Sequence, residues 1–124
     1  MKKFLISGFH SANLILIIFY LYPGSIFGCF LYNDCSTQPH ITRDFLISSN
    51  HLYAFIILSA LGFLAYANKS KFKFLIIYLL SLSIVLEGLH IIIPNRGFEW
   101  GDLFGNIFGV IFVIIIYKVK TRHV

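Results

Sequence analysis

Several residues with chemically reactive side chains lie within or beside apolar stretches in the second half of the chain. Glu87 and His90 are spaced i, i+3 and would share one face of a helix, where they could act as a general acid and base. Arg96 could hold a phosphate or carboxylate with its planar fork of N–H donors. Asp102 and Asn106, spaced i, i+4, could orient a group held there. These roles require structural elements that bring the side chains together.

The composition of the chain is that of a membrane protein. Of its 124 residues, 58% are hydrophobic and only 12% are charged, and the mean hydropathy is +0.83. Soluble domains carry about 25% charged residues, and so few charges cannot cover a solvated surface. The composition excludes an ordinary cytosolic domain, a disordered chain and a soluble nucleic-acid binder. The length allows one domain, residues 1–124.

Four stretches approach the roughly 20 apolar residues that a helix needs to cross a bilayer. They cover residues 4–22, 47–67, 72–93 and 102–117, and the third is the cleanest. Residues 23–46 would form a long loop on the outer side. We therefore predict an all-α membrane protein, a bundle of four transmembrane helices surrounded by the lipid bilayer.

Charged residues divide between the two sides of this predicted bundle. Eight of the ten Lys and Arg residues lie on one side: Lys2, Lys3, Lys69, Lys71, Lys73, Lys118, Lys120 and Arg122. The five acids lie on or near the other side: Asp34, Asp44, Glu87, Glu99 and Asp102. Basic flanks stay in the cytoplasm, so both termini are predicted to be cytoplasmic. The net charge of +5 then reflects topology rather than nucleic-acid binding.

An alternative interpretation of the N-terminus is a cleaved signal peptide, because Met1, Lys2 and Lys3 precede an apolar stretch. Cleavage would leave three spans and would place the two termini on opposite sides of the membrane. We therefore expect the first stretch to be a span.

His51 opens the second span at the same outer level as the acidic residues. Six polar side chains are thereby predicted to converge on the outer half of the bundle and to form its ligand-binding site: His51, Glu87, His90, Arg96, Asp102 and Asn106. Ionisable groups at membrane depth are costly and face the bundle interior. Hydrogen bonding between helices would explain the same residues, and Asp102 would also suit the start of its helix.

A metal site is a further interpretation of this cluster. The Glu87–His90 spacing occurs in helical metal sites, and His51 and Asp102 could complete the ligand set. Hydrogen bonding explains one such pair equally well. We therefore expect no metal and no cofactor.

Small and polar residues indicate how the helices pack. Gly101, Gly105 and Gly109 form a G-x-x-x-G-x-x-x-G ridge that would let another helix approach closely. In the first span, His10 and Asn13 are spaced i, i+3 and are predicted to form hydrogen bonds between helices.

Both cysteines, Cys29 and Cys35, lie in the outer loop. On the predicted topology they face an oxidising compartment, where a short disulfide could form. Two free thiols near the membrane surface are the alternative, and the sequence does not choose between them.

The stretch from Ser83 to Gly109 resembles the VanZ-like family of membrane proteins, which takes its name from a teicoplanin-resistance protein. The residues that carry the resemblance are Glu87, Pro94, Arg96, Phe98, Asp102, Asn106 and Gly109. The preceding helix resembles the family at His51, Ala54, Phe55 and Gly62. The likeness covers roughly residues 45–117. The sequence departs from the family pattern at Ile47 and Ser48, where members often carry Asp and Lys, and at His90, where many carry Gln.

The resemblance implies a multi-pass protein of the bacterial cytoplasmic membrane, in the context of glycopeptide resistance or surface polysaccharides. The chain would then bind a lipid-linked saccharide, a glycopeptide or a membrane-protein partner at the outer polar cluster. One alternative is a membrane-embedded hydrolase or transferase acting on a lipid-linked phosphate or saccharide, with Glu87, His90, Arg96 and Asp102 as candidate catalytic residues. Another is a small subunit of a larger assembly or a homo-oligomer.

Overall fold

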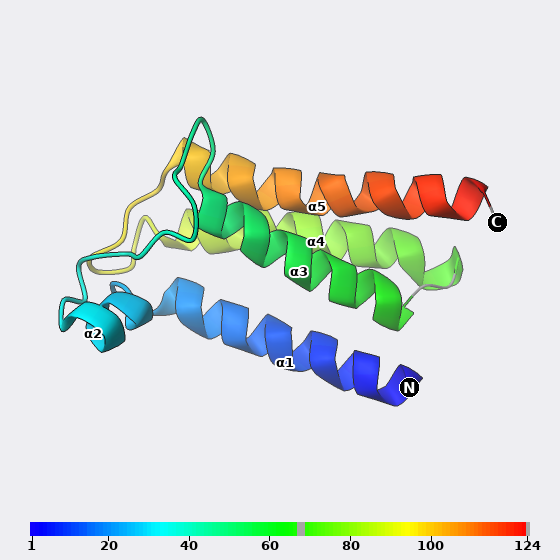
Figure 1. Cartoon of the computed structure of the whole chain (residues 1–124), viewed down its shortest axis with the longest axis horizontal. Helices are drawn as coiled ribbons and strands as arrows, with labels where there is room; N and C mark the ends of the chain where they lie inside the picture. Colours follow the sequence, from blue (N-terminus) through cyan, green and yellow to red (C-terminus); the bar gives the residue numbers. More distant parts are fainter. Residues whose placement is uncertain (67–68, 124) are drawn as a thin grey trace.

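The computed structural model describes residues 1–66 and 69–123, and within them every regular element is a helix (Figure 1). The five helices are α1 (Lys2–Leu21), α2 (Ile26–Tyr32), α3 (Ser49–Tyr66), α4 (Lys69–Leu89) and α5 (Trp100–Arg122). Four of them, all except α2, are long and apolar enough to cross a membrane. This confirms the all-helical prediction with four spanning-capable helices. The predicted end of the second span at residue 67 lies outside the described residues.

Helix α4 ends earlier than the sequence predicted. The span was predicted to reach residue 93, but the helix ends at Leu89, and the following residues form tighter turns in which Ile91 N donates to Gly88 O and Ile92 N to Leu89 O. The cause is Pro94, since a proline disfavours the helical conformation of the residue before it. The early end frees the segment 90–99 to cross the end of the bundle.

Helix α5 runs further than predicted at both ends. It begins at Trp100 and continues to Arg122, beyond the predicted 102–117. Lysine and arginine are good helix formers, and cations are favourable near a helix C-terminus, so the basic tail extends the helix. The helix α1 likewise begins at Lys2 rather than at residue 4.

The short helix α2 lies inside the segment that was predicted to be a loop. Ser25 caps it by accepting a hydrogen bond from Gly28 N at 2.9 Å, and a disulfide joins Cys29 to Cys35 across its end. Asp34 follows the helix and accepts hydrogen bonds from Ser36 and Thr37, which lower its pKa to about 2. The loop therefore has its own local order.

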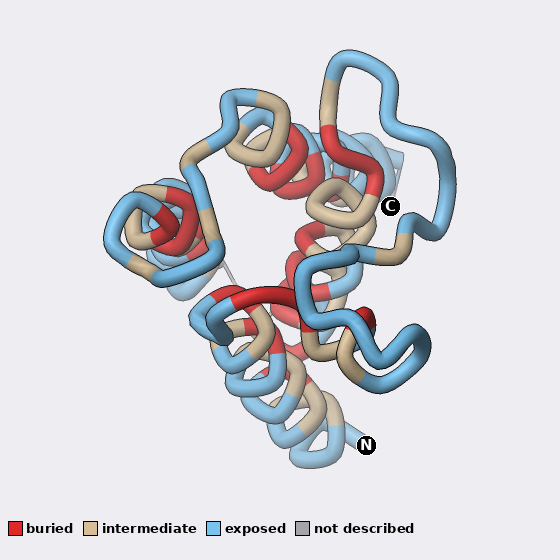
Figure 2. The backbone as a smooth tube through the Cα atoms, turned by 90° about the vertical axis from the view of Figure 1, so that its left-hand side faces the viewer, coloured by how far each residue is buried: buried red, intermediate tan, exposed pale blue. Residues whose placement is uncertain are grey.

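The long helices pack around a small apolar core and expose many apolar side chains outward. Figure 2, viewed along the bundle, shows buried residues turned toward the centre and exposed ones toward the periphery. Phe55, Leu58, Leu79 and Val110 are almost completely buried. Large apolar residues such as Leu64 are more than half exposed, as lipid-facing positions would be. This outward apolar surface is consistent with a bilayer environment.

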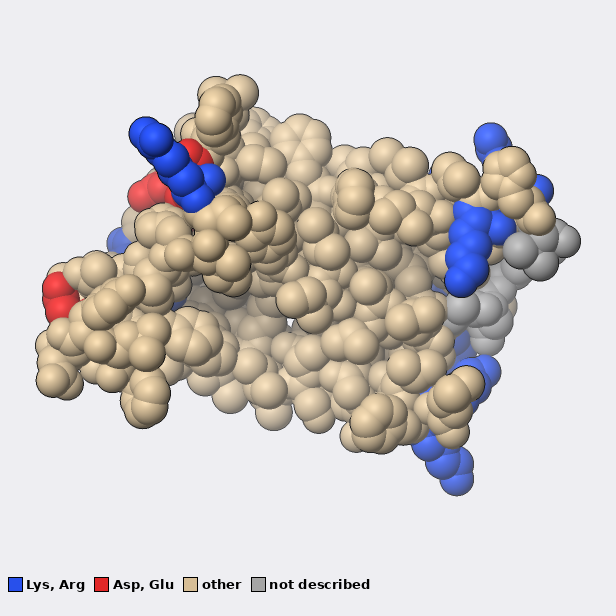
Figure 3. Space-filling view, in the orientation of Figure 1, with Lys and Arg blue, Asp and Glu red and all other residues tan. Residues whose placement is uncertain are grey.

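Both chain termini lie at the same end of the bundle (Figure 1). Figure 3 shows Lys and Arg side chains gathered at that end, whereas the acidic side chains visible in this view lie at the other. The uneven distribution of charge predicted from the sequence is therefore present in the folded chain. We refer to the end opposite the termini as the distal end.

Hydrogen bonds tie α1 to its neighbours near the terminal end. His10 Nε2 lies 2.6 Å from the Tyr66 hydroxyl of α3, and Asn13 Nδ2 donates to the Tyr78 hydroxyl of α4 at 2.5 Å. These contacts confirm the predicted hydrogen bonds between helices. They hold α1 against the rest of the bundle at the end away from the polar cluster.

The glycine ridge of α5 faces α3. A Cβ atom on Gly109 would lie 2.7 Å from Leu52 O, and one on Gly105 would lie 2.8 Å from Ser48 O. Gly101 has more room, since its nearest neighbour, Leu46 O, would be 3.6 Å away. Two of the three glycines therefore permit backbone contact between α3 and α5.

Replacing Gly109 by alanine is expected to destabilise the bundle by about 1–3 kcal/mol, because the added methyl group meets backbone that cannot move independently of α3. Gly88→Ala is the matched control: its Cβ meets nothing within 4 Å, and alanine is the better helix former. Reversible unfolding of the detergent-solubilised protein measures both. Equal stabilities of the two variants would contradict the close approach.

Candidate functional site

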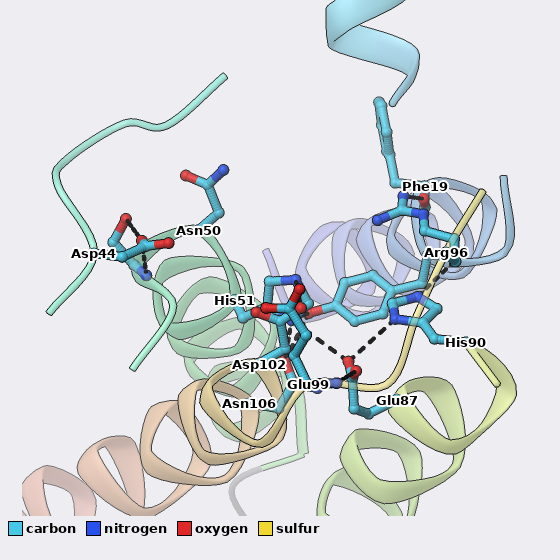
Figure 4. Close-up of polar contacts among 12 residues, drawn as sticks. Phe19, Asp44, Asn50, His51, Glu87, His90, Arg96, Glu99, Asp102 and Asn106 are labelled. Atoms are coloured by element: carbon cyan, nitrogen blue, oxygen red, sulfur yellow. Dashed lines mark hydrogen bonds and ion pairs between the residues drawn. The ribbon is translucent and has the colours of Figure 1, made fainter. Parts of the chain in front are cut away.

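The predicted polar residues gather at the distal end from three helices and one connection (Figure 4). His51 lies in the first turn of α3, Glu87 in the last turn of α4, and Asp102 in the first turn of α5. Asn106 follows one turn later on α5. Residues His90 and Arg96 lie between α4 and α5. Tyr20, in the last turn of α1, also joins the cluster and was not predicted.

Asn106 is the fully buried centre of one half of the cluster. Its Nδ2 donates to Ser83 O at 3.2 Å, which fixes the orientation of the amide because that carbonyl can only accept. Its Oδ1 then accepts from the Tyr20 hydroxyl at 2.6 Å and lies 3.1 Å from His51 Nδ1. Since Oδ1 is only an acceptor, Nδ1 of His51 carries the proton. Asn106 thereby sets the ring orientation and tautomer of His51.

Glu87 is the fully buried centre of the other half. Its Oε1 accepts a hydrogen bond from the backbone N–H of Glu99 at 3.0 Å, where α5 begins. A carboxylate at a helix N-terminus is favourable. Its Oε2 lies 3.2 Å from His90 Nδ1 and 3.9 Å from His51 Nδ1, within ion-pair range of both. Neither contact is aligned as a hydrogen bond, so Oε2 has no hydrogen-bond partner among the described residues.

His90 and Arg96 bind the carbonyl end of α1. His90 Nε2 lies 2.9 Å from Tyr20 O, and its ring stacks on the Tyr20 ring. Arg96 donates from Nε to Tyr22 O at 3.2 Å and from Nη2 to Phe19 O at 2.9 Å. Donors at a helix C-terminus satisfy carbonyls that have no partner within the helix.

Arg96 was predicted to bind a phosphate or carboxylate group. In the structure it makes hydrogen bonds that hold the end of α1. Two of its five N–H donors, from Nε and Nη2, are already used by backbone carbonyls, so the edge of the guanidinium formed by these two nitrogens is not free for an anion. Partial burial lowers the pKa of Arg96 from its ordinary value. Figure 4 shows Arg96 beside Phe19, away from the contact between His51 and Asp102.

His51 and Asp102 form the accessible edge of the cluster. His51 Nε2 lies 3.4 Å from Asp102 Oδ2, and the two side chains are 14% and 19% exposed. Glu87, His90 and Asn106 are each at most 1% exposed. A molecule that approached the cluster from outside would meet His51, Asp102 and the partly exposed Arg96 before the three buried side chains.

A pocket lies elsewhere in the bundle. It has a volume of about 470 Å³ and is lined by residues of α1, α3 and α4 near the terminal end, among them His10, Asn13, Tyr66 and Tyr78. Four of its polar side chains form the hydrogen bonds between helices described above, and Lys71 also lines it. The pocket and the predicted site are therefore distinct.

Comparisons with models of known protein families give no match for this chain. Comparisons with curated proteins and with solved structures give none either. The resemblance to the VanZ-like family therefore stays a prediction from the motif residues.

Proposed function

We propose that the chain is a VanZ-like protein of the bacterial cytoplasmic membrane that binds a lipid-linked saccharide of the cell envelope at its distal polar cluster. The cellular consequence would be reduced susceptibility to teicoplanin, as the resemblance implies. The observation that carries the proposal is the accessible pair His51 and Asp102 beside the buried side chains of Glu87, His90 and Asn106.

The proposed orientation places both termini in the cytoplasm and the cluster at the outer surface. Its support is that both termini lie at one end of the bundle and that Lys and Arg side chains gather at that end (Figure 3). A lipid-linked saccharide has its lipid in the bilayer and its sugar at the membrane surface. The distal ends of four apolar helices meet such a molecule at the boundary between these two parts.

The chemistry of the accessible pair suits a sugar. Carboxylate and imidazole groups offer acceptors and donors for hydroxyl groups, and both side chains are oriented before a ligand arrives. Asn106 holds the ring of His51, and Asp102 is fixed in the first turn of α5. A site held in place by buried partners loses little conformational entropy on binding.

Native mass spectrometry of the detergent-solubilised chain with a lipid-linked disaccharide tests the proposal. We expect saturable binding of one molecule to the wild type and a loss of at least about tenfold in affinity for Asp102→Asn, equivalent to roughly 1.4 kcal/mol. His40→Gln is the control, because His40 also contacts a carboxylate but lies in the exposed outer loop.

Two outcomes would contradict the proposal. One is the absence of saturable binding to folded wild type, and the other is equal affinity of the wild type and Asp102→Asn. Release of the saccharide or of phosphate during incubation would favour the hydrolase or transferase alternative. Retention of a partner protein in place of the lipid would favour the subunit alternative.

A further inference from the structure

Three side chains from three different helices turn ligand atoms toward one another at the distal end. His51, Glu87 and Asp102 come from α3, α4 and α5, and one nitrogen and two carboxylate oxygens lie within 4.8 Å of one another. His51 Nε2 and Asp102 Oδ2 are 3.4 Å apart, and Glu87 Oε2 lies 3.9 Å from the other ring nitrogen of His51. In a tetrahedral site with bonds of about 2.0–2.2 Å, neighbouring ligand atoms lie roughly 3.3–3.6 Å apart. The pair His51 and Asp102 therefore already has the spacing of two metal ligands, and Glu87 is near enough to supply a third.

The hydrogen bonds around His51 leave its second nitrogen without a proton. Asn106 Oδ1 takes the N–H of Nδ1, so a neutral His51 directs the lone pair of Nε2 at the carboxylate of Asp102. Two acceptors at this distance repel each other. A proton or a cation between them would turn the repulsion into attraction.

The same situation recurs at Glu87. His90 Nε2 faces the carbonyl oxygen of Tyr20, so the N–H lies there, and a neutral His90 turns the lone pair of Nδ1 toward Glu87 Oε2. Oε2 is completely buried and has no hydrogen-bond partner among the described residues, which is costly for a carboxylate oxygen. A proton on His90 Nδ1 would turn this second contact into an ion pair with Glu87. A proton or a cation between His51 Nε2 and Asp102 Oδ2 would do the same for the first contact.

We propose that His51 Nε2 and the carboxylates of Glu87 and Asp102 bind one divalent transition-metal ion, with Zn²⁺ as the best match. Imidazole and carboxylate ligands suit this ion, and three protein ligands leave one position open. The two cysteines are joined in a disulfide away from the cluster, so no thiolate competes.

Two of the three proposed ligands are held in place by hydrogen bonds with neighbouring groups, as ligands of metal sites commonly are. Asn106 accepts from the distal nitrogen of His51, and the N–H of Glu99 binds the second oxygen of Glu87. Such supporting hydrogen bonds orient the ligands of known metal sites. The inference goes beyond the proposed function, since binding of the ion requires no saccharide.

The test uses the full chain, purified in detergent with a tag that contains no histidine or cysteine. After removal of metal with a chelator, the protein is equilibrated with Zn²⁺ or with Mg²⁺, desalted and analysed for metal. We expect about one Zn²⁺ per chain and no retained Mg²⁺, because Mg²⁺ prefers an all-oxygen octahedral site. Asp102→Asn and His51→Gln should weaken Zn²⁺ binding by more than the roughly 10–100-fold that loss of a supporting residue costs. His40→Gln should leave it unchanged.

X-ray absorption at the zinc edge identifies the metal ligands in the wild-type protein. It therefore tests the proposal even if a variant fails to fold. The proposal predicts nitrogen and oxygen neighbours at about 2.0–2.2 Å, including imidazole. Absence of retained Zn²⁺, a shell of sulfur or of water alone, or equal binding by the folded ligand variants would overturn it. If the saccharide binds but Zn²⁺ does not, only the metal proposal is wrong. If Zn²⁺ binds but the saccharide does not, only the proposed function is wrong.

Discussion

Replacement of Glu87 by leucine is expected to destabilise the folded chain by about 3–5 kcal/mol, the largest effect of any single substitution considered for this bundle. Leucine has a similar volume, so the loss comes from polar groups rather than from a cavity. The N–H of Glu99 would lose its acceptor at the start of α5, and His90 would lose its ion-pair partner. An unsatisfied buried polar group costs about 1–3 kcal/mol.

Two further variants separate this explanation from a general sensitivity of the distal end. Glu87→Gln keeps an acceptor for the Glu99 N–H and should cost less than half as much as Glu87→Leu. Glu99→Gln removes an exposed carboxylate that makes no capping hydrogen bond, and should change stability by less than about 0.5 kcal/mol. Equilibrium unfolding in detergent measures all three. A Glu87→Leu variant as stable as Glu99→Gln would contradict the role assigned to Glu87.

Replacement of Arg96 by alanine is expected to destabilise the chain by about 2–4 kcal/mol and to loosen the distal end of α1 in particular. A hydrogen bond from a charged donor contributes about 1.5–3 kcal/mol, and Arg96 makes two of them, although partial exposure reduces their sum. The carbonyls of Phe19 and Tyr22 would lose these donors. Amide hydrogen exchange should therefore rise in the last turn of α1 more than in α3.

Arg96→Lys tests whether geometry or charge matters at this position. A single ammonium group cannot reproduce the planar fork that reaches both carbonyls, so lysine should restore less than half of the lost stability. Arg43→Ala is the matched control, because Arg43 is an exposed arginine in the outer loop. Full rescue by lysine, or an equal effect of Arg43→Ala, would show that Arg96 acts only through its charge.

The four long helices could be predicted because apolar length alone identifies a spanning helix, but their ends could not. Helix α4 ends at Leu89 although residues 91–93 are three isoleucines, since the turn before Pro94 overrides their hydropathy. Helix α2 was missed because its seven residues are too few for a periodic pattern. It depends on a cap by Ser25 and on the Cys29–Cys35 disulfide, which are contacts with neighbouring residues.

The sequence predicted which residues belong to the candidate site better than it predicted which atoms those residues contact. Asp102 and Asn106 are one turn apart on α5 and share a face of it, and Glu87 lies in the last turn of α4 with His90 just beyond its end, so these four residues lie together at the distal end. The hydrogen-bond partners of Arg96 could not be predicted, because they are backbone carbonyls of α1, and every residue type carries the same carbonyl group.

Tyr20 was missed for a related reason. Its hydroxyl reaches Asn106, but nothing in the first span indicates which of its side chains faces the cluster. Its position in the last turn of α1, at the distal end, becomes informative only once the helices are packed and its ring stacks on that of His90.

We infer that His51 and Asp102 serve binding, whereas His90, Arg96 and Asn106 hold the helices together through backbone carbonyls. Parallel measurement of unfolding and of lipid-linked disaccharide binding on one preparation of Asp102→Asn tests it most directly. We predict that this variant unfolds within about 1 kcal/mol of the wild type, as a partly exposed residue should, and loses at least about tenfold in affinity. Binding equal to that of the wild type, or a loss of binding that merely follows a loss of folding, would contradict the claim.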